Sequence, residues 1–124
     1  MLGTSKLIAF AATGDAARAK VFYEQTLGLR LVADEPFAVI FDAGGVMLRL
    51  QKVGELPRID YTVLGWEIAD LRSVMAELKQ RGVIFQRYAQ LRQDEEGVWT
   101  APGGAKIAWF KDPDGNVLSL TQFQ

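Results

Sequence analysis

The sequence predicts an α+β fold in which two βαβββ modules form a curved mixed sheet around a cavity. Several short segments alternate apolar with other residues, as half-buried strands require. Two stretches instead place apolar side chains at helical spacing, each after an aspartate that can cap a helix. The order of strand, helix and further strands then occurs twice, which indicates two copies of one supersecondary unit.

The first module is predicted to open with a strand at residues 6–13, KLIAFAAT. A helix then begins at Gly14-Asp15, with Ala19, Phe22 and Tyr23 on one face, and ends at Gly28. Three strands complete this module, near residues 30–33, 37–42 and 46–52.

The second module repeats this order. A strand is expected at residues 60–68, followed by a helix that begins at Asp70 and ends before Gly82. The remaining strands are expected near residues 83–88, 97–100, 105–111 and 117–122. With residues 52–58 as a linker, the chain is interpreted as one domain, 1–124, containing repeat 1 at about 5–52 and repeat 2 at about 59–124.

Residues 112–116, DPDGN, separate the last two predicted strands. Each residue of this segment is of a type that favours turns, so the sequence indicates a tight turn with a structural role.

Composition limits the classes of function. The chain has 124 residues and a net charge of −1, which does not indicate a surface for nucleic acid or anionic membranes. No apolar run approaches the length of a membrane span. The first residues lack the apolar core of a signal peptide, so a cytoplasmic location is expected.

The chain contains no cysteine and no histidine. These absences remove the thiolate and imidazole ligands that zinc, copper and most non-haem iron sites prefer, and leave oxygen donors suited to magnesium, manganese or calcium. They also remove the commonest general base. Any acid or base here is therefore a carboxylate, a lysine or a tyrosine.

Strand alternation predicts which side chains share a face. The more apolar series is expected against the helices: Leu48, Leu50, Thr62, Leu64, Trp66, Ile68, Leu118 and Leu120. The opposite series is mixed in character: Lys6, Ile8, Phe10, Met47, Arg49, Gln51, Tyr61, Val63, Gly65, Glu67, Val117, Ser119 and Thr121. A ligand cavity is expected on this mixed face.

Several motifs resemble the glyoxalase / bleomycin-resistance / extradiol-dioxygenase superfamily, also called vicinal oxygen chelate. They cover nearly the whole chain: Asp15, Phe22-Tyr23 and Leu27-Gly28-Leu29, then Gly65 to Ile68, Asp70-Leu71 and Leu78 to Val83, then Phe110 and Asp112 to Asn116. The resemblance implies the paired βαβββ fold, a pocket for a small organic molecule and a homodimer. It does not distinguish among the chemistries of the family.

Metal-dependent members of that family hold a divalent ion with four side chains of the inner sheet face. Matched by motif offset, these positions fall on Ile8, Arg49, Val63 and Ser119. None is a histidine or a carboxylate, and Arg49 brings a permanent cation to the place of a metal. The resemblance therefore implies a member that has lost its metal positions and has no cofactor.

The leading hypothesis is a metal-free binding protein for a small organic molecule. Its expected pocket residues are Arg49, Met47, Tyr61, Glu67, Ser119 and Phe10. A mid-strand arginine must pair with a carboxylate such as Glu67, bind an anionic group or reach solvent. The aromatic residues Trp99, Trp109, Tyr61, Tyr88 and Phe10 offer surface for a planar ligand, although core packing explains each of them as well.

Two functional alternatives stay open, besides a bare structural or interaction module whose cavity is filled by side chains. One is a divalent-metal-dependent lyase or isomerase of the glyoxalase type that uses oxygen ligands, with Glu67 as the best catalytic candidate. The other is an antibiotic-sequestering protein of the bleomycin-resistance type. The near-neutral charge is mildly unfavourable for the latter, because binders of a cationic drug gain from an acidic cleft.

Overall fold

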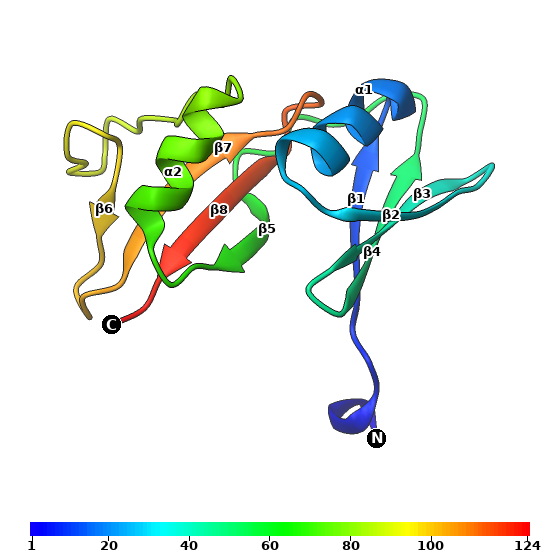
Figure 1. The fold of residues 1–124 in the computed structure, drawn as a ribbon, viewed down its shortest axis with the longest axis horizontal. Helices are drawn as coiled ribbons and strands as arrows, with labels where there is room; N and C mark the ends of the chain where they lie inside the picture. Colours follow the sequence, from blue (N-terminus) through cyan, green and yellow to red (C-terminus); the bar gives the residue numbers. More distant parts are fainter. The chain divides into compact units, whose positions relative to one another are not determined.

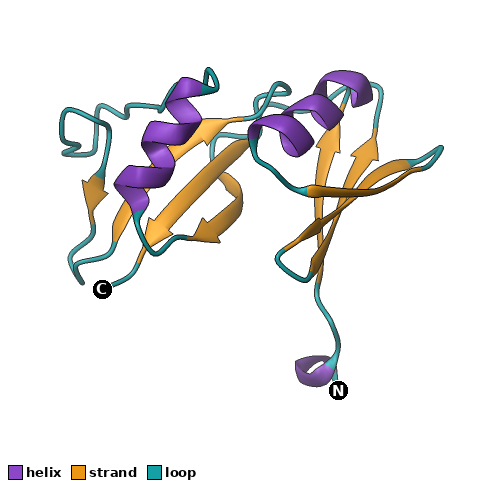
Figure 2. Ribbon diagram, viewed as in Figure 1, coloured by secondary structure: helices purple, strands orange, loops and turns teal.

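A computed structural model describes residues 1–124, which divide into two compact units, Met1–Arg58 and Ile59–Gln124. The boundary directly follows the predicted linker. Each unit contains a helix and its own four-stranded mixed sheet (Figures 1 and 2). The predicted α+β fold of two βαβββ modules is thereby confirmed.

In the first unit a short 3-10 helix, Leu2–Thr4, precedes the module, and the N-terminal segment runs away from the strands (Figure 1). The elements that follow are β1 (Ile8–Thr13), α1 (Ala16–Val21), a π-helical turn η2 (Phe22–Thr26), β2 (Arg30–Asp34), β3 (Ala38–Ala43) and β4 (Val46–Lys52). The strand order is β1-β4-β3-β2. Strand β1 is parallel to β4, and the other neighbours are antiparallel.

Both predicted ends of the first helix are confirmed. The Asp15 carboxylate accepts a hydrogen bond from the backbone N–H of Arg18 at 3.2 Å, which satisfies one of the free N–H groups of the helix start. At the other end Gly28 adopts a φ of 78°, a backbone conformation that favours glycine.

The core of the first unit lies on one face of its sheet. Leu48 and Leu50 of β4 are opposite Phe41 and Val39 of β3, and all four side chains are buried. Tyr23, from the helical segment, packs on this face with its ring centroid 5.8 Å from that of Phe41. The predicted helix side of β4 is therefore correct, and Arg49, between Leu48 and Leu50, belongs to the other face.

The second unit contains β5 (Thr62–Glu67), α2 (Leu71–Gln80), β6 (Trp99–Thr100), β7 (Lys106–Lys111) and β8 (Val117–Gln122). The strand order is β5-β8-β7-β6, with β5 parallel to β8. Asp70 caps α2 by accepting from the backbone N–H of Ser73 at 3.2 Å. The apolar face of α2, Leu71, Met75 and Leu78, is buried, as its spacing predicts.

The predicted strand at residues 83–88 is wrong. Val83 and Phe85 are buried in alternation, which produced the strand-like pattern, but the segment is not paired as a strand. It makes a single backbone hydrogen bond to β7, from the N–H of Gln86 to the carbonyl of Trp109 at 2.8 Å. Packing of the Phe85 ring against Phe110, with centroids 5.7 Å apart, anchors the segment instead.

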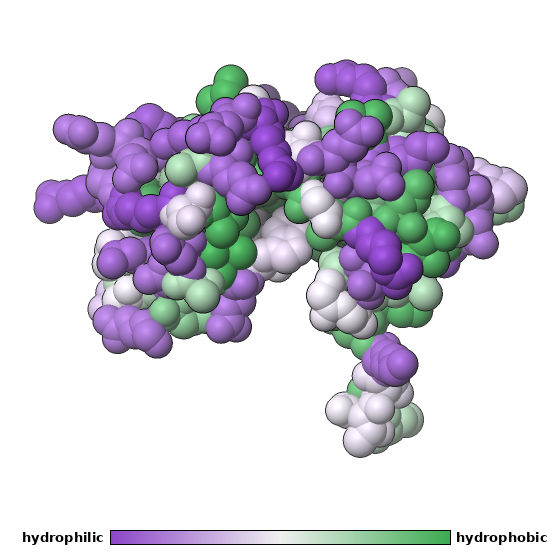
Figure 3. All heavy atoms as spheres, viewed as in Figure 1, coloured by the Kyte–Doolittle hydropathy of each residue, from purple (hydrophilic) through white to green (hydrophobic).

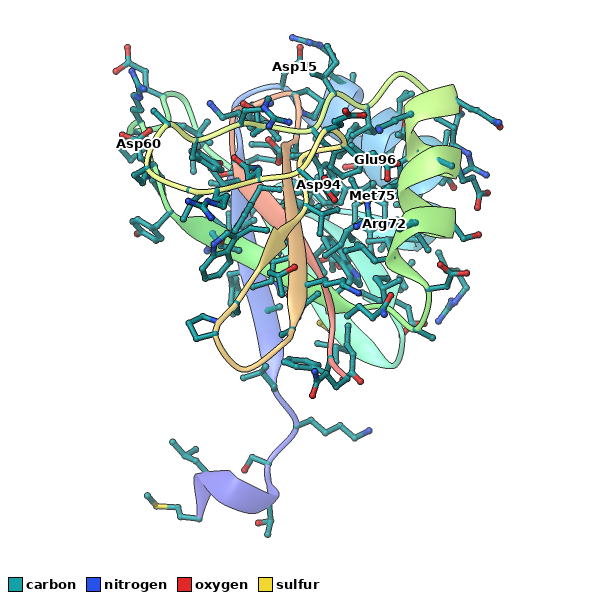
Figure 4. All side chains as sticks on the ribbon, turned by 90° about the vertical axis from the view of Figure 1, so that its left-hand side faces the viewer. Asp15, Asp60, Arg72, Met75, Asp94 and Glu96 are labelled. Atoms are coloured by element: carbon teal, nitrogen blue, oxygen red, sulfur yellow. The ribbon has the colours of Figure 1, made fainter.

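Side chains, rather than a sheet ladder, also order the loop before β6. Arg72 of α2 reaches Asp94 at 2.8 Å and also pairs with Glu96 (Figure 4). Partial burial opposes ionisation of Asp94, but the backbone N–H groups of Val98 and Glu96 and the Arg72 guanidinium outweigh it and lower the pKa of this carboxyl.

The DPDGN turn forms as predicted. The Asp112 carboxylate accepts hydrogen bonds from the backbone N–H groups of Asp114 and Asn116, both at 2.9 Å, and Gly115 has a φ of 88°. This turn connects β7 to β8, the two strands at the centre of the second sheet.

Neither α-helix has the length or the apolar character needed to cross a membrane.

Candidate functional site

The face of the first sheet opposite its core carries three of the predicted ligand residues. In the observed register Arg49 of β4 lies between Phe10 of β1 and Ile40 of β3, and Met47 lies between Ile8 and Asp42 in the next row. Phe10 and Met47 are 48% and 41% exposed. Large apolar side chains are thus left accessible on this sheet face. Apolar residues also reach the surface of this unit in the view of Figure 3, where they are green.

A pocket of about 410 Å³ lies at this face. Ile8, Val32, Ile40 and Met47 contribute to its apolar walls, and its charged lining residues are Lys6, Arg30 and Asp42. Arg30 and Asp42 pair loosely, at 3.9 Å. A mostly apolar cavity of this size with a few charged groups is typical of a small-molecule site, for which volumes of roughly 300–1,000 Å³ are usual.

Arg49 extends from the middle of β4. It lies on the same sheet face as this pocket, two residues along the strand from Met47, which lines the pocket. Its guanidinium is 3.6 Å from the carboxylate of Glu35 and 4.0 Å from the Sδ of Met47, and its side chain is 29% exposed. The sequence suggested pairing with a carboxylate, but it did not suggest Glu35, which precedes β3 in the same unit. Because Glu35 is itself half exposed, this ion pair is solvated and contributes little to stability.

Ser119 occupies the centre of the second sheet. It lies between Gly65 of β5 and Trp109 of β7 in the register, and it is 8% exposed. A Cβ atom at Gly65 would come within 2.6 Å of the Ser119 Oγ. The absence of a side chain at residue 65 therefore provides the space that the hydroxyl of Ser119 fills.

Replacing Gly65 by alanine is expected to lower the free energy of unfolding by about 1 kcal/mol, because overpacking costs more than the strand interior gains from losing a glycine. In the Ser119→Ala background the same change should raise stability by about 0.5 kcal/mol, since the close contact is gone. Urea denaturation of the four chains measures both effects. An effect of the same sign in both backgrounds would contradict the observed contact.

One face assignment in the second unit is wrong. Strict alternation placed Thr62 on the helix side with Leu64, but the register shifts between these two residues, and Thr62 lies opposite Val117. Its hydroxyl accepts a hydrogen bond from the indole Nε1 of Trp109 at 3.2 Å, so Thr62 belongs to the face of Ser119. An irregularity of this kind cannot be derived from a period of two.

The other predicted residues of this unit lie at the two ends of β5. Tyr61 directly precedes the strand, is 69% exposed and lines a second, smaller pocket. Glu67 is the last residue of the strand, lies opposite Thr121 and is exposed. Glu67 can act as a solvent-accessible base or ligand.

The residues at the four expected metal positions do not fit a divalent metal. Ile8 and Val63 offer no donor atom, Arg49 offers only N–H groups, and Ser119 offers one neutral hydroxyl. Within neither unit do three carboxylates gather into a group that could hold an ion. No step of a reaction is therefore assigned to a metal.

Sequence reasoning missed several residues of the larger pocket, including Val32, Asp42 and Arg30. The alternation of Ile40 with Asp42 on β3 was an available signal, because these two residues share the face of Arg49 and Met47. Val32 could not be assigned, since the pairing of β2 with β3 shifts between Leu31 and Ala33.

Two βαβββ modules, each with its own four-stranded mixed sheet, define a fold of the vicinal oxygen chelate type. The model of the Glyoxalase/Bleomycin resistance protein/Dioxygenase superfamily matches residues 7–120, and the chain belongs to this superfamily. No curated protein sequence matches the chain significantly.

Solved structures share this fold. Lactoylglutathione lyase from Agrobacterium tumefaciens aligns with a TM-score of 0.73 at 18% identity, over 95% of this chain and 93% of that one. The fosfomycin resistance protein FosX from Listeria monocytogenes aligns with a TM-score of 0.75 at 13% identity, over 98% and 94% of the two chains. At these identities the likeness shows the fold alone.

A superfamily member from Sphaerobacter thermophilus is 26% identical to this chain, with a TM-score of 0.72 over 94% of this chain and 97% of that one.

Proposed function

We propose that this protein binds a small organic molecule without using a metal ion, and that it works as a homodimer. The pocket of about 410 Å³ on the open face of the first sheet is the observation that carries the proposal. Its ligand would contact Met47, which lines the pocket. Phe10 and Arg49 lie on the same sheet face and are proposed to contact the ligand beside the pocket, with Arg49 available to an anionic or hydrogen-bonding group. Tyr61, Glu67 and Ser119 are proposed as ligand-binding residues of the second unit.

The chemistry of the pocket favours an amphipathic ligand. Apolar side chains cover most of its wall, so an apolar body would be desolvated there. Lys6, Arg30 and Asp42 together give the lining one net positive charge, and Arg49 with Glu35 adds none. A ligand with an apolar body and a carboxylate or another polar group fits this balance best.

The test is a screen of small organic acids, amines and neutral compounds by ligand-observed NMR, followed by calorimetric titration of any compound that binds. Arg49→Ala is expected to weaken binding of an anionic ligand by at least tenfold, because a charge-assisted contact of the partly buried guanidinium beside the pocket is lost. Arg18→Ala, at an exposed position of α1, removes the same charge and should leave binding unchanged.

If Arg49→Ala leaves the affinity of every discovered ligand unchanged, the site assignment is wrong. Native mass spectrometry in buffer containing magnesium and manganese tests the rest of the proposal, and a metal-free dimer is the expected species. A stoichiometric metal adduct, together with turnover that disappears in Glu67→Gln, would replace the proposal with the enzyme alternative.

A further inference from the structure

A second pocket, of about 170 Å³, lies wholly within the second unit. It is formed by the residues around the start of β5, the segment near Tyr88 and one side of β7. Its main lining residues are Asp60, Tyr61, Thr62, Tyr88, Leu91 and Trp109. Asp60, labelled in Figure 4, lies next to the loop that follows Tyr88, since both line this pocket. This pocket is smaller than a drug-sized site and has room for a head group.

Aromatic rings form walls of this pocket, and they are held in place. The rings of Tyr88 and Trp109 meet edge to face, with centroids 5.6 Å apart and planes at 87°. The ring of Trp99, in the same unit, packs against the ring of Trp109, with centroids 6.1 Å apart. The indole Nε1 of Trp109 donates to Thr62, and the backbone N–H of Tyr88 donates to the side chain of Gln93 at 2.7 Å. Rings fixed in this way lose little entropy when a ligand binds.

One carboxylate lines this pocket. Asp60 is the only charged residue among those that line it. Burial of the Tyr88 phenol raises its pKa, and the negative charge of Asp60 raises it further, so Tyr88 stays neutral at physiological pH. The pocket thus combines one carboxylate with neutral aromatic rings.

Aromatic faces and a carboxylate attract the same kind of ligand. The faces of tryptophan and tyrosine attract cations through the ring quadrupole, most strongly when the cation carries methyl groups and is weakly hydrated. A carboxylate adds Coulomb attraction, whereas it repels carboxylates and phosphates. Neutral apolar ligands gain only burial, and the hydroxyl and amide groups of Thr62 and Gln90 in the lining make such burial less favourable.

We propose that the pocket formed by Asp60, Tyr61, Tyr88 and Trp109 binds the alkylammonium group of an organic cation. This site is separate from the pocket on the first sheet. A bound molecule that carries such a group would place it against the Trp109 and Tyr88 rings, with Asp60 as its counter-charge. The proposal is independent of the ligand that the first unit binds.

The experiment compares choline with 3,3-dimethyl-1-butanol, which has the same shape without the charge. Each is titrated into the full chain, and the indole N–H signal of Trp109 is followed by NMR, assigned through Trp109→Phe. Choline is expected to bind at least tenfold more tightly than the alcohol, and 0.5 M sodium chloride should reduce this preference.

Asp60→Asn should weaken choline binding at least fivefold while leaving the alcohol unchanged, and Tyr88→Leu should weaken choline binding as well. Glu24→Gln removes a carboxylate from an exposed position of the first unit and is the matched control, with no expected effect. Thermal unfolding of each variant establishes that it is folded. The conservative variant Tyr88→Phe keeps the aromatic ring and should retain choline binding.

Equal affinity for the two probes, no binding of choline, or an unchanged affinity in Asp60→Asn would overturn the proposal. Arg49→Ala distinguishes this site from the proposed ligand pocket of the first unit. It should leave choline binding intact, and a loss of choline binding in this variant would place the cation elsewhere and also overturn the proposal.

Discussion

Replacing Phe110 by alanine is expected to lower the free energy of unfolding by about 4 kcal/mol. Phe110 is fully buried in β7, and its ring packs edge to face on Phe85, so the change removes a large apolar side chain and leaves a cavity. Chemical denaturation with guanidinium chloride measures the loss. It is a large part of the stability of an ordinary domain.

The same variant should loosen residues 83–88, because Phe85 loses the ring on which it rests. Hydrogen exchange at the N–H of Gln86, which bonds to β7, reports this local effect. Phe110→Leu should cost roughly 1–2 kcal/mol, since it keeps part of the volume. Phe37→Ala, at an exposed phenylalanine, should change stability by less than about 0.5 kcal/mol. A similar loss for Phe37 and Phe110 would contradict the described core.

Replacing Asp112 by alanine is expected to lower the free energy of unfolding by about 3 kcal/mol. Its carboxylate accepts two backbone N–H groups and the side-chain amide of Asn116 at 2.8 Å, and both Asp112 and Asn116 are buried. Alanine would leave these donors buried without their acceptor. Thermal and urea unfolding measure the loss.

Asp112→Asn serves as the graded variant, because its side-chain oxygen can still accept while its NH₂ group meets the NH₂ of Asn116. It should lose less than the alanine variant. Glu55→Ala, at an exposed carboxylate between the modules, should be nearly neutral. If Asp112→Ala were equally neutral, the hydrogen bonds of the turn would have no energetic role.

Much of the fold could be predicted because local chemistry and tertiary structure agree. Asp15 and Asp70 cap the helices that their positions indicate, and Gly28 and Gly82 follow the helix ends with positive φ. The alternation that placed Leu48 and Leu50 on the core face also placed Arg49 and Met47 on the open face. These inferences need only a regular period and a glycine or an aspartate at its end.

The failures occurred where structure depends on long-range partners. Residues 83–88 alternate like a strand, but Phe85 is buried by Phe110 rather than by sheet pairing, and no local pattern distinguishes the two. Thr62 changed sides because the register shifts in the middle of β5. The partner of Arg49 was missed for the same reason, since the approach of Glu35 depends on how β3 and β4 pair.

The π-helical turn at Phe22–Thr26 has a consequence for the gene. The backbone N–H of Leu27 donates to the carbonyl of Phe22, five residues earlier in the chain. This turn therefore contains one residue more than an α-helical turn. Loss of a single codon here would let the helix continue with its usual spacing, whereas loss of the codon for Val46, at the start of β4, would move Met47 and Arg49 to the opposite side of the sheet. The first helix of this chain can therefore lose one residue at its π-helical turn without a change of register in the strands that carry the pocket.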